Sequence, residues 1–192
     1  MFWAAMPALR RSAGGVENRF DVMNRLIGSI PPGGTTVFYH PFIAQPSLHV
    51  NARASLFNME LSTSFAEVCH AVAEGTVFIH KHHVDEMLDA GVTCDKVRLA
   101  GGIARSDVWA QMFADILNRT VETVNGDELG ALGIAMTAGI GAGVYKDYAD
   151  AARQAVTVRA RFEPDPDRHA AYMKRYEQWT ELIGCMSPFW NR

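Results

Sequence analysis

The spacing of apolar residues predicts a chain in which helices and strands alternate. The clearest helix spans about residues 64–90, because Ser64 and Glu67 form a capping box and Gly91 supplies a C-terminal stop. Between these signals, apolar side chains recur at helical spacing. The same criteria predict helices at 16–27, 107–118, 128–141, 148–156 and 167–183, and short strands at 35–39, 96–100 and 120–124. Such alternation indicates an α/β layered fold.

Small residues dominate the helix predicted at 128–141. They are Gly130, Ala131, Gly133, Ala135, Ala138 and Gly139. Glycine lowers helix propensity by about 1 kcal/mol relative to alanine, so we expect another element to pack closely against this backbone in compensation. The composition therefore predicts a buried helix.

Composition and charge narrow the classes of function. The 192 residues are 48% apolar and 20% charged, which suits one globular domain, and the formal net charge of -3 gives no basic footprint for nucleic acid. The apolar runs are shorter than the ~20 residues that span a bilayer, so we expect no membrane partner. The three cysteines are widely spaced and predict neither a disulfide framework nor a zinc site, which fits a cytoplasmic location.

Two adjacent glycines, Gly101 and Gly102, separate the strand at 96–100 from the helix at 107–118. Without Cβ atoms, the backbone there can approach a flat ligand, and the free N–H groups of the following helix favour negative or polar ligand atoms. Ligands of open α/β sheets bind where strands end and helices begin. A glycine pair before a helix is also ordinary turn chemistry, so both interpretations stay open on these residues alone.

The segment containing this turn resembles a motif of a known family. GGIARSDVW at 101–109 is similar to the adenosine-binding motif of the FGGY carbohydrate kinases. ELGALGIA at 128–135 and GAGVYKDY at 141–148 are similar to the helix and turn that follow that motif in the family. Upstream, YHPF at 39–42 and AVAEG at 71–75 match two further family segments. The resemblance keeps the same order along the chain, so the sequence is identified as part of a member of this family.

The resemblance implies a fold and a division of the chain. The fold would be α/β, as part of the C-terminal actin-like ATPase (ribonuclease H-like) domain of sugar kinases. Residues 1–19 would be a frayed N-terminal segment, 20–185 the partial C-terminal kinase domain, and 186–192 a tail. The phrases EGTVFIH at 74–80 and SDVWAQM at 106–112 are most similar to the L-xylulose and 3-dehydro-L-gulonate kinase branch, with an erythritol or xylulose kinase as the near competitor.

The resemblance also implies a nucleotide site. Gly101 and Gly102 would flank the adenosine of ATP or ADP, Ile103 would pack on it, and Ser106 would offer a polar contact near the adenine. Arg105 is a further candidate.

Other parts of the kinase site have no counterpart in this sequence. The family's phosphate loop, its Mg²⁺-binding acid and its catalytic Asp lie before the matched region, so no catalytic residue and no Mg²⁺ ligand maps onto this chain. The segment 44–49 replaces the family's GERxP loop, and we expect no sugar contact from it. The chain would then be the adenosine-binding part of a kinase for a ketopentose or related sugar or polyol, inactive without an N-terminal lobe.

An alternative from a different class is a non-enzymatic nucleotide-binding or oligomerisation remnant of a degenerate kinase. An unrelated dinucleotide-binding enzyme is disfavoured, because Gly101-Gly102 is not the G-x-G-x-x-G fingerprint. Without the rest of a kinase, apolar surface would be exposed, so we expect self-association.

Several conspicuous side chains have ordinary interpretations. His82 and Glu86 lie one helical turn apart, and we expect a solvated helix face there rather than a metal site. Trp109 and Trp179 fall on apolar stripes and are predicted to anchor the core. Cys69 is predicted to be an inert thiol inside its helix.

Overall fold

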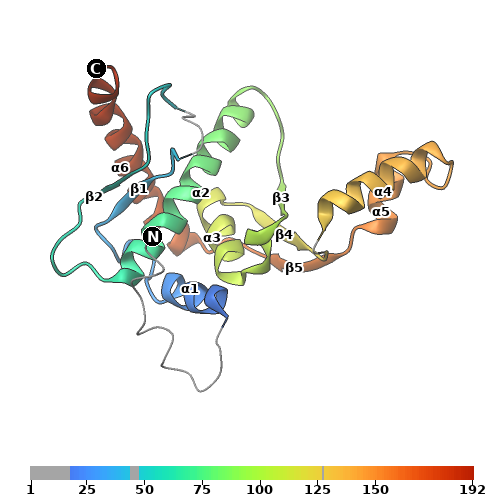
Figure 1. Ribbon diagram of the computed structural model, residues 1–192, viewed down its shortest axis with the longest axis horizontal. Helices are drawn as coiled ribbons and strands as arrows, with labels where there is room; N and C mark the ends of the chain where they lie inside the picture. The colour runs from blue at the N-terminus through green and yellow to red at the C-terminus, as the bar shows by residue number, and fades with distance from the viewer. Residues whose placement is uncertain (1–17, 44–47, 127) are drawn as a thin grey trace.

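The computed structural model describes residues 18–43, 48–126 and 128–192 (Figure 1). Along the chain the elements are α1 (Arg19–Gly28), β1 (Phe38–His40), β2 (Ser55–Phe57), α2 (Phe65–Asp89), β3 (Lys96–Leu99), the 3₁₀ helix η2 (Gly102–Arg105), α3 (Asp107–Leu117), β4 (Thr120–Val124), α4 (Leu129–Gly141), α5 (Tyr148–Ala155), β5 (Val158–Phe162) and α6 (Pro166–Trp190). Residues 1–17 of the predicted frayed segment and 44–47 of the predicted loop lie outside the described residues. The division of the chain into segments stays a prediction.

A three-stranded sheet in the order β3-β4-β5 positions the glycine turn. β3 runs parallel to β4, and β5 is antiparallel to β4. The helix α3 packs against β4, whose Val121 and Thr123 are fully buried. Because β3 and β4 are parallel, their carboxyl ends meet at one edge of the sheet, where the chain continues into Gly101 and Asn125.

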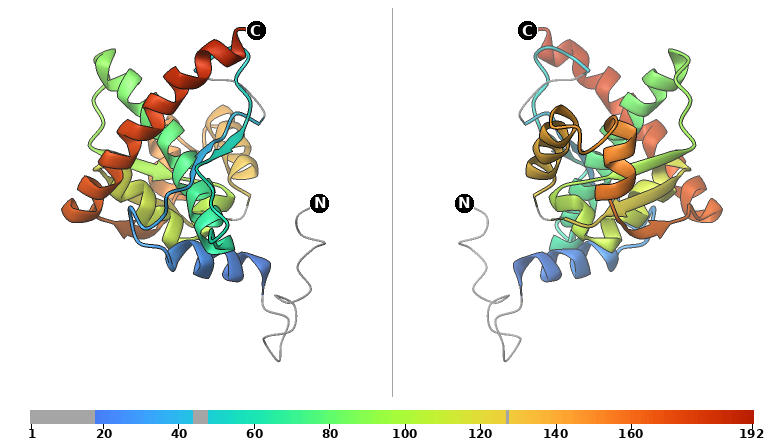
Figure 2. Two further views of the ribbon diagram at one scale, coloured as in Figure 1. Left: turned by 90° about the vertical axis from the view of Figure 1, so that its left-hand side faces the viewer. Right: turned by 90° about the vertical axis from the view of Figure 1, so that its right-hand side faces the viewer.

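The main core surrounds the long helix α2. Ser64 caps α2 through the predicted capping box, and α1, α3, α6 and β1 all contact the helix. Figure 2 shows α6 running along one side of α2 and α3. Near the middle of α2, Gly75 lies so close to the Tyr39 carbonyl of β1 that an added Cβ would collide with it. Glycine at this position is therefore a packing requirement.

A buried ion pair joins three parts of this core. Arg175 of α6 donates hydrogen bonds to both carboxylate oxygens of Glu74 in α2, each at 2.6 Å. It also donates to the carbonyls of Thr35 and Val37 at 2.6 and 2.7 Å, and its guanidinium lies 4.3 Å from the centre of the Phe38 ring. Both charged side chains are buried and hydrogen-bonded, so the pair holds the segment before β1 between α2 and α6.

Four elements differ from the sequence prediction. The strands β2 and β5 and the short helix η2 were not predicted, because β2 and η2 are only 3 and 4 residues long and the Val158–Phe162 strand carries two arginines and is largely exposed. The closing helix does not end near residue 183 but continues through Pro188 to Trp190. Trp190 is buried against the rings of His40 and Phe42, and this contact stabilises the extra turns.

The prediction of a buried helix at 128–141 is wrong for the part of the chain that the structure describes. α4 has no buried residue, and Ile134 is 74% exposed. Figure 1 shows α4 and α5 extending away from the other elements. Tyr145, in the turn after α4, lies against Gly139, so α4 is covered on one side only by its own hairpin. The small residues permit close packing, but the described chain supplies no other element to fill that space.

Candidate functional site

The glycine turn has a backbone that only glycine adopts readily. Gly101 follows β3 and has φ of 82° and ψ of -163°, a region that side chains with a Cβ rarely enter. The 3₁₀ helix η2 follows directly, and the Ser106 hydroxyl then accepts the Trp109 N–H at 3.3 Å as the N-cap of α3. The strand, turn and helix arrangement predicted from the sequence is therefore present.

The reason for a glycine at position 102 is not the one that applies at position 101. Its φ is not positive, and an added Cβ would meet no atom within 4 Å. Neither backbone conformation nor internal packing therefore requires glycine at position 102. The absence of a side chain there keeps open the space beside the turn.

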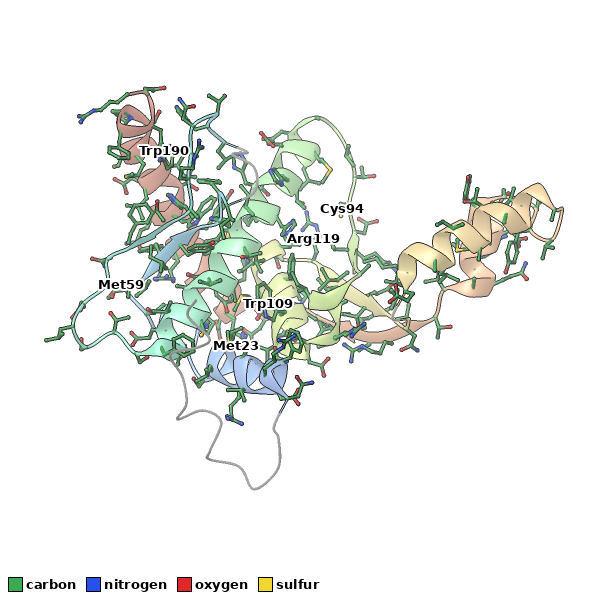
Figure 3. All side chains as sticks on the ribbon, in the orientation of Figure 1. Met23, Met59, Cys94, Trp109, Arg119 and Trp190 are labelled. Carbon is green, nitrogen blue, oxygen red and sulfur yellow. The ribbon has the colours of Figure 1, made fainter. Side chains whose placement is uncertain are left out.

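That space is a hollow of about 620 Å³ between α1 and the start of α3. Most of its lining surface is apolar and comes from Phe20, Met23, Ile27, Ile103 and Trp109, beside Gly102. The polar lining residues are Asn18, Asp21, Asn24, Arg105 and Ser106. In Figure 3, Met23 of α1 and Trp109 of α3 lie where the two helices meet. The hollow has the size and apolar character of a site for a flat organic ring.

A hydrogen bond joins the two walls of this hollow. The Ser106 hydroxyl donates to Oδ1 of Asn24 in α1 at 2.7 Å while it accepts the Trp109 N–H. Ser106 is 7% exposed, so its polar group faces Asn24 more than the open space. The Ser106 hydroxyl, predicted to contact the adenine, is therefore hydrogen-bonded within the protein. It holds Asn24, whose polar side chain lines the hollow.

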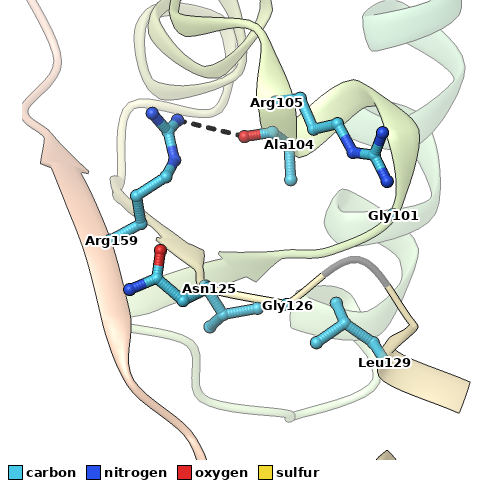
Figure 4. A pocket seen from close by; sticks show the side chains of 8 residues that line it. Gly101, Ala104, Arg105, Asn125, Gly126, Leu129 and Arg159 are labelled. Atoms are coloured by element: carbon cyan, nitrogen blue, oxygen red, sulfur yellow. Dashed lines mark hydrogen bonds between the residues drawn. The ribbon is translucent and has the colours of Figure 1, made fainter. Parts of the chain in front are cut away.

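A smaller hollow of about 180 Å³ lies at the carboxyl ends of β3 and β4, with Gly101, Ala104 and Arg105 in its lining (Figure 4). Arg159 of β5 reaches across it and donates to the Ala104 carbonyl at 3.1 Å and to Asp107 Oδ1 at 2.8 Å. The remaining lining residues are Val124, Asn125, Gly126 and Leu129. The guanidinium of Arg159 is therefore paired with the Asp107 carboxylate beside this hollow.

The structure brings the five predicted site residues together but divides them between the two hollows. Ile103, Ser106 and Gly102 line the large hollow, Gly101 lines the small one, and Arg105 borders both. The α1 wall was not predicted as part of the site, because no local pattern in the sequence relates residues 18–27 to a turn some 80 positions away. The amphipathic pattern of α1 was the only sequence signal that could have pointed to this wall.

The two tryptophans of the apolar stripes have different roles. Trp179 is fully buried, which confirms its prediction as a core anchor. Trp109 is only half-buried and lines the large hollow, so its prediction as a plain core anchor is incomplete. Its position in the first turn of α3, directly after the glycine turn, explains this exposure.

The remaining candidate side chains form no second reactive site in the described chain. His82 and Glu86 lie 3.6 Å apart on α2, but no group of three or more potential metal ligands occurs in residues 18–43, 48–126 and 128–192. Burial raises the pKa of the Cys69 thiol to about 11, which keeps it protonated and unreactive. None of the helices that the structure describes is long and apolar enough to cross a membrane.

The chain is similar to known sugar kinases. It is 31% identical over 92% of its length to the L-xylulose/3-keto-L-gulonate kinase of Escherichia coli, of which it covers 35%. It superposes with a TM-score of 0.80 on the xylulose kinase of Rhodospirillum rubrum, at 23% identity, with 100% of this chain and 38% of that one covered. The glycerol kinase of Plasmodium falciparum, solved with ADP, gives a TM-score of 0.68 at 23% identity over 85% of this chain and 33% of its own.

These proteins are considerably longer than the chain, which spans about a third of their length. The shared α/β fold is that of the C-terminal, actin-like ATPase domain of such kinases. The model of the FGGY family of carbohydrate kinases, C-terminal domain, matches residues 7–142. The chain therefore belongs to the FGGY family of carbohydrate kinases and carries its C-terminal domain.

Proposed function

We propose that the chain is the adenosine-binding part of an ATP-dependent sugar kinase and that it holds the adenine of ATP or ADP in the hollow between α1 and the glycine turn. The observation that carries the proposal is Gly102, where the fold does not require glycine and an added side chain would enter the hollow. A nucleotide against this backbone supplies a reason for the missing Cβ.

The lining of the hollow suits a nucleobase. A purine has two apolar faces and a polar edge, and apolar side chains such as Ile103 and Met23 can contact the faces while polar groups meet the edge. The ribose would pass Gly102, and Arg105, which borders both hollows, would lie near the anionic part of the nucleotide. The glycerol kinase of Plasmodium falciparum was solved with ADP, which supports an adenine nucleotide as the ligand of this related chain.

For the whole kinase we propose a ketopentose or related sugar or polyol as substrate. The support is the similarity to proteins named L-xylulose kinases, one of them at 31% identity.

Phosphoryl transfer needs a carboxylate to take the hydroxyl proton and Mg²⁺ to neutralise phosphate charge. Carboxylates are the usual protein ligands of Mg²⁺, and the five predicted site residues include none. We propose that those groups belong to other parts of a cytoplasmic kinase and that this chain binds nucleotide without transferring phosphate.

The test is a calorimetric titration of the chain with ATP and ADP. The chain should bind both nucleotides weakly, and Gly102→Trp, which fills the hollow, should abolish binding. Gly133→Ala is the matched control, because an added Cβ there also meets nothing but lies on α4, away from the hollow. Absence of binding to the unaltered chain at millimolar nucleotide, or retained binding in Gly102→Trp, would refute the site.

An oligomerisation role is the second candidate, and α4 is the observation that favours it. The helix from Leu129 to Gly141 contains no charged side chain and is exposed on most sides. We propose that a second copy of the chain covers this helix, because burial of apolar surface drives association. This role does not require nucleotide binding.

Light scattering tests the second candidate. The unaltered chain should run as a dimer or larger species, and Ile134→Glu should shift it to a monomer. Leu61→Glu is the control, because Leu61 is also an exposed apolar residue but lies in the loop before α2. A monomeric unaltered chain would exclude association through α4.

A further inference from the structure

We infer that Asn24 reads the polar edge of the base in the large hollow and that the Ser106 hydroxyl fixes its amide so that adenine is preferred over guanine. The inference rests on the proposed function, since it names the residue that selects the base in that site. It adds a specificity determinant on α1, outside the glycine turn.

The hydrogen bond between Ser106 and Asn24 sets the orientation of the amide. The Ser106 hydroxyl donates its hydrogen to Asn24 Oδ1 at 2.7 Å and uses one lone pair for the Trp109 N–H. An amide flip would place Nδ2 against Ser106 and leave the hydroxyl hydrogen without this acceptor. Because Ser106 is buried, losing that hydrogen bond is unfavourable. The oxygen of Asn24 therefore stays on the side of Ser106.

Asn24 keeps hydrogen-bonding capacity for a ligand. The amide nitrogen Nδ2 has no partner among the described residues, and Oδ1 retains a second lone pair. Asn18 and Asp21 also line the hollow. The Oδ1 of Asn18 accepts the Phe20 N–H as the cap of α1, and both side chains are exposed. Asn24 is half-buried in the wall. It therefore presents a donor and an acceptor side by side within the hollow.

This pair of groups matches adenine. The edge of adenine carries the N6 amino donor next to the N7 acceptor, and an asparagine amide can bond both at once. Guanine carries two acceptors, O6 and N7, on the corresponding edge, so Asn24 Oδ1 would face an oxygen. A well-placed bidentate contact of this kind changes the preference between bases by about tenfold or more.

The test compares ATP and GTP titrations for the unaltered chain, for Asn24→Asp and for Asn24→Leu. The unaltered chain should prefer ATP by about tenfold or more. In Asn24→Asp the carboxylate keeps the bond from Ser106 and can still accept from N6, but it has no donor for N7, which both purines share, so both affinities should fall while the preference for ATP persists. Asn24→Leu has neither group, so its preference should fall to parity. The ratio of the two affinities removes charge effects on the phosphates, which ATP and GTP share. Asn118→Asp, with the same charge change on the exposed end of α3, should leave the ratio unchanged.

Two variants of Ser106 test the positioning step. Ser106→Thr retains a hydroxyl and the cap of α3, so it should keep the preference for ATP. Ser106→Ala releases the Asn24 amide and should lower the ATP preference more than it lowers total nucleotide affinity. If ATP binds and the ratio is the same in all Asn24 and Ser106 variants, the inference is overturned and the proposed function stands. If the unaltered chain binds neither nucleotide, the proposed function fails and the inference fails with it.

Discussion

The helices α2 and α4 are both rich in apolar residues, but the protein buries the middle of α2 and leaves α4 exposed. α2 has polar residues on one side, and α1, α3, α6 and β1 cover its other sides. α4 is apolar around its whole circumference, and in the described chain only its own hairpin with α5 covers it. The comparison indicates that apolar composition predicts a need for contact but does not identify the partner.

The largest expected effect concerns the buried pair that holds the α2 region together. Replacing Arg175 with Met would leave the Glu74 carboxylate buried without the guanidinium that donates two hydrogen bonds to it. The carbonyls of Thr35 and Val37 would also lose their donor. The expected loss is about 3–5 kcal/mol in the free energy of unfolding, measured by urea denaturation. The double variant Arg175→Met with Glu74→Leu should recover most of the loss. A single-variant loss below about 1 kcal/mol would contradict a structural role for the pair.

A matched pair of glycine substitutions compares the two helices directly. Gly75→Ala in α2 forces a Cβ into the Tyr39 carbonyl and should cost about 1–3 kcal/mol. Gly133→Ala in α4 meets no atom of its own chain and should stabilise the monomeric chain by about 0.5–1 kcal/mol, because alanine favours helix. Thermal unfolding of both variants gives the signs. A destabilising effect of Gly133→Ala would show that another surface covers α4 in solution.

The smallest expected effect on stability concerns Glu122 in the sheet β3-β4-β5. Hydrogen bonds from Arg161 and Arg98, together with Lys96, lower the pKa of Glu122 to about 2 from its usual value of 4.5. Because the folded pKa is the lower one, Glu122 contributes stability above about pH 4.5, and this contribution is lost as the pH falls toward 2. The melting temperature of Glu122→Gln should therefore be below that of the unaltered chain at pH 6 and approach it near pH 2. A constant difference across this range would rule out the charge of Glu122 as its cause.

Much of the fold follows from local signals in the sequence. The capping box at Ser64 and the stop at Gly91 delimit α2 because capping chemistry acts within a few residues. The glycine turn between β3 and α3 was also a local signal, and Gly101 in it has a positive φ. Such features need no knowledge of the rest of the molecule.

Long-range features could not be predicted. The Glu74–Arg175 pair joins residues 101 positions apart, and the bond from Ser106 to Asn24 spans 82. Single-sequence patterns record which faces are apolar, not which faces meet. For the same reason, the small residues of α4 predicted a close neighbour that the described chain does not supply, and the α1 wall of the site was missed.

An amide map of the chain by two-dimensional NMR, recorded with and without ADP, tests the central claim most directly. Binding in the hollow predicts that the shifted amides cluster at residues 20–27 and 102–109, which supply its two walls. The amides of α4 and β2 should stay in place. Shifts confined to other elements, or none at saturating ADP, would contradict an adenosine site at the glycine turn.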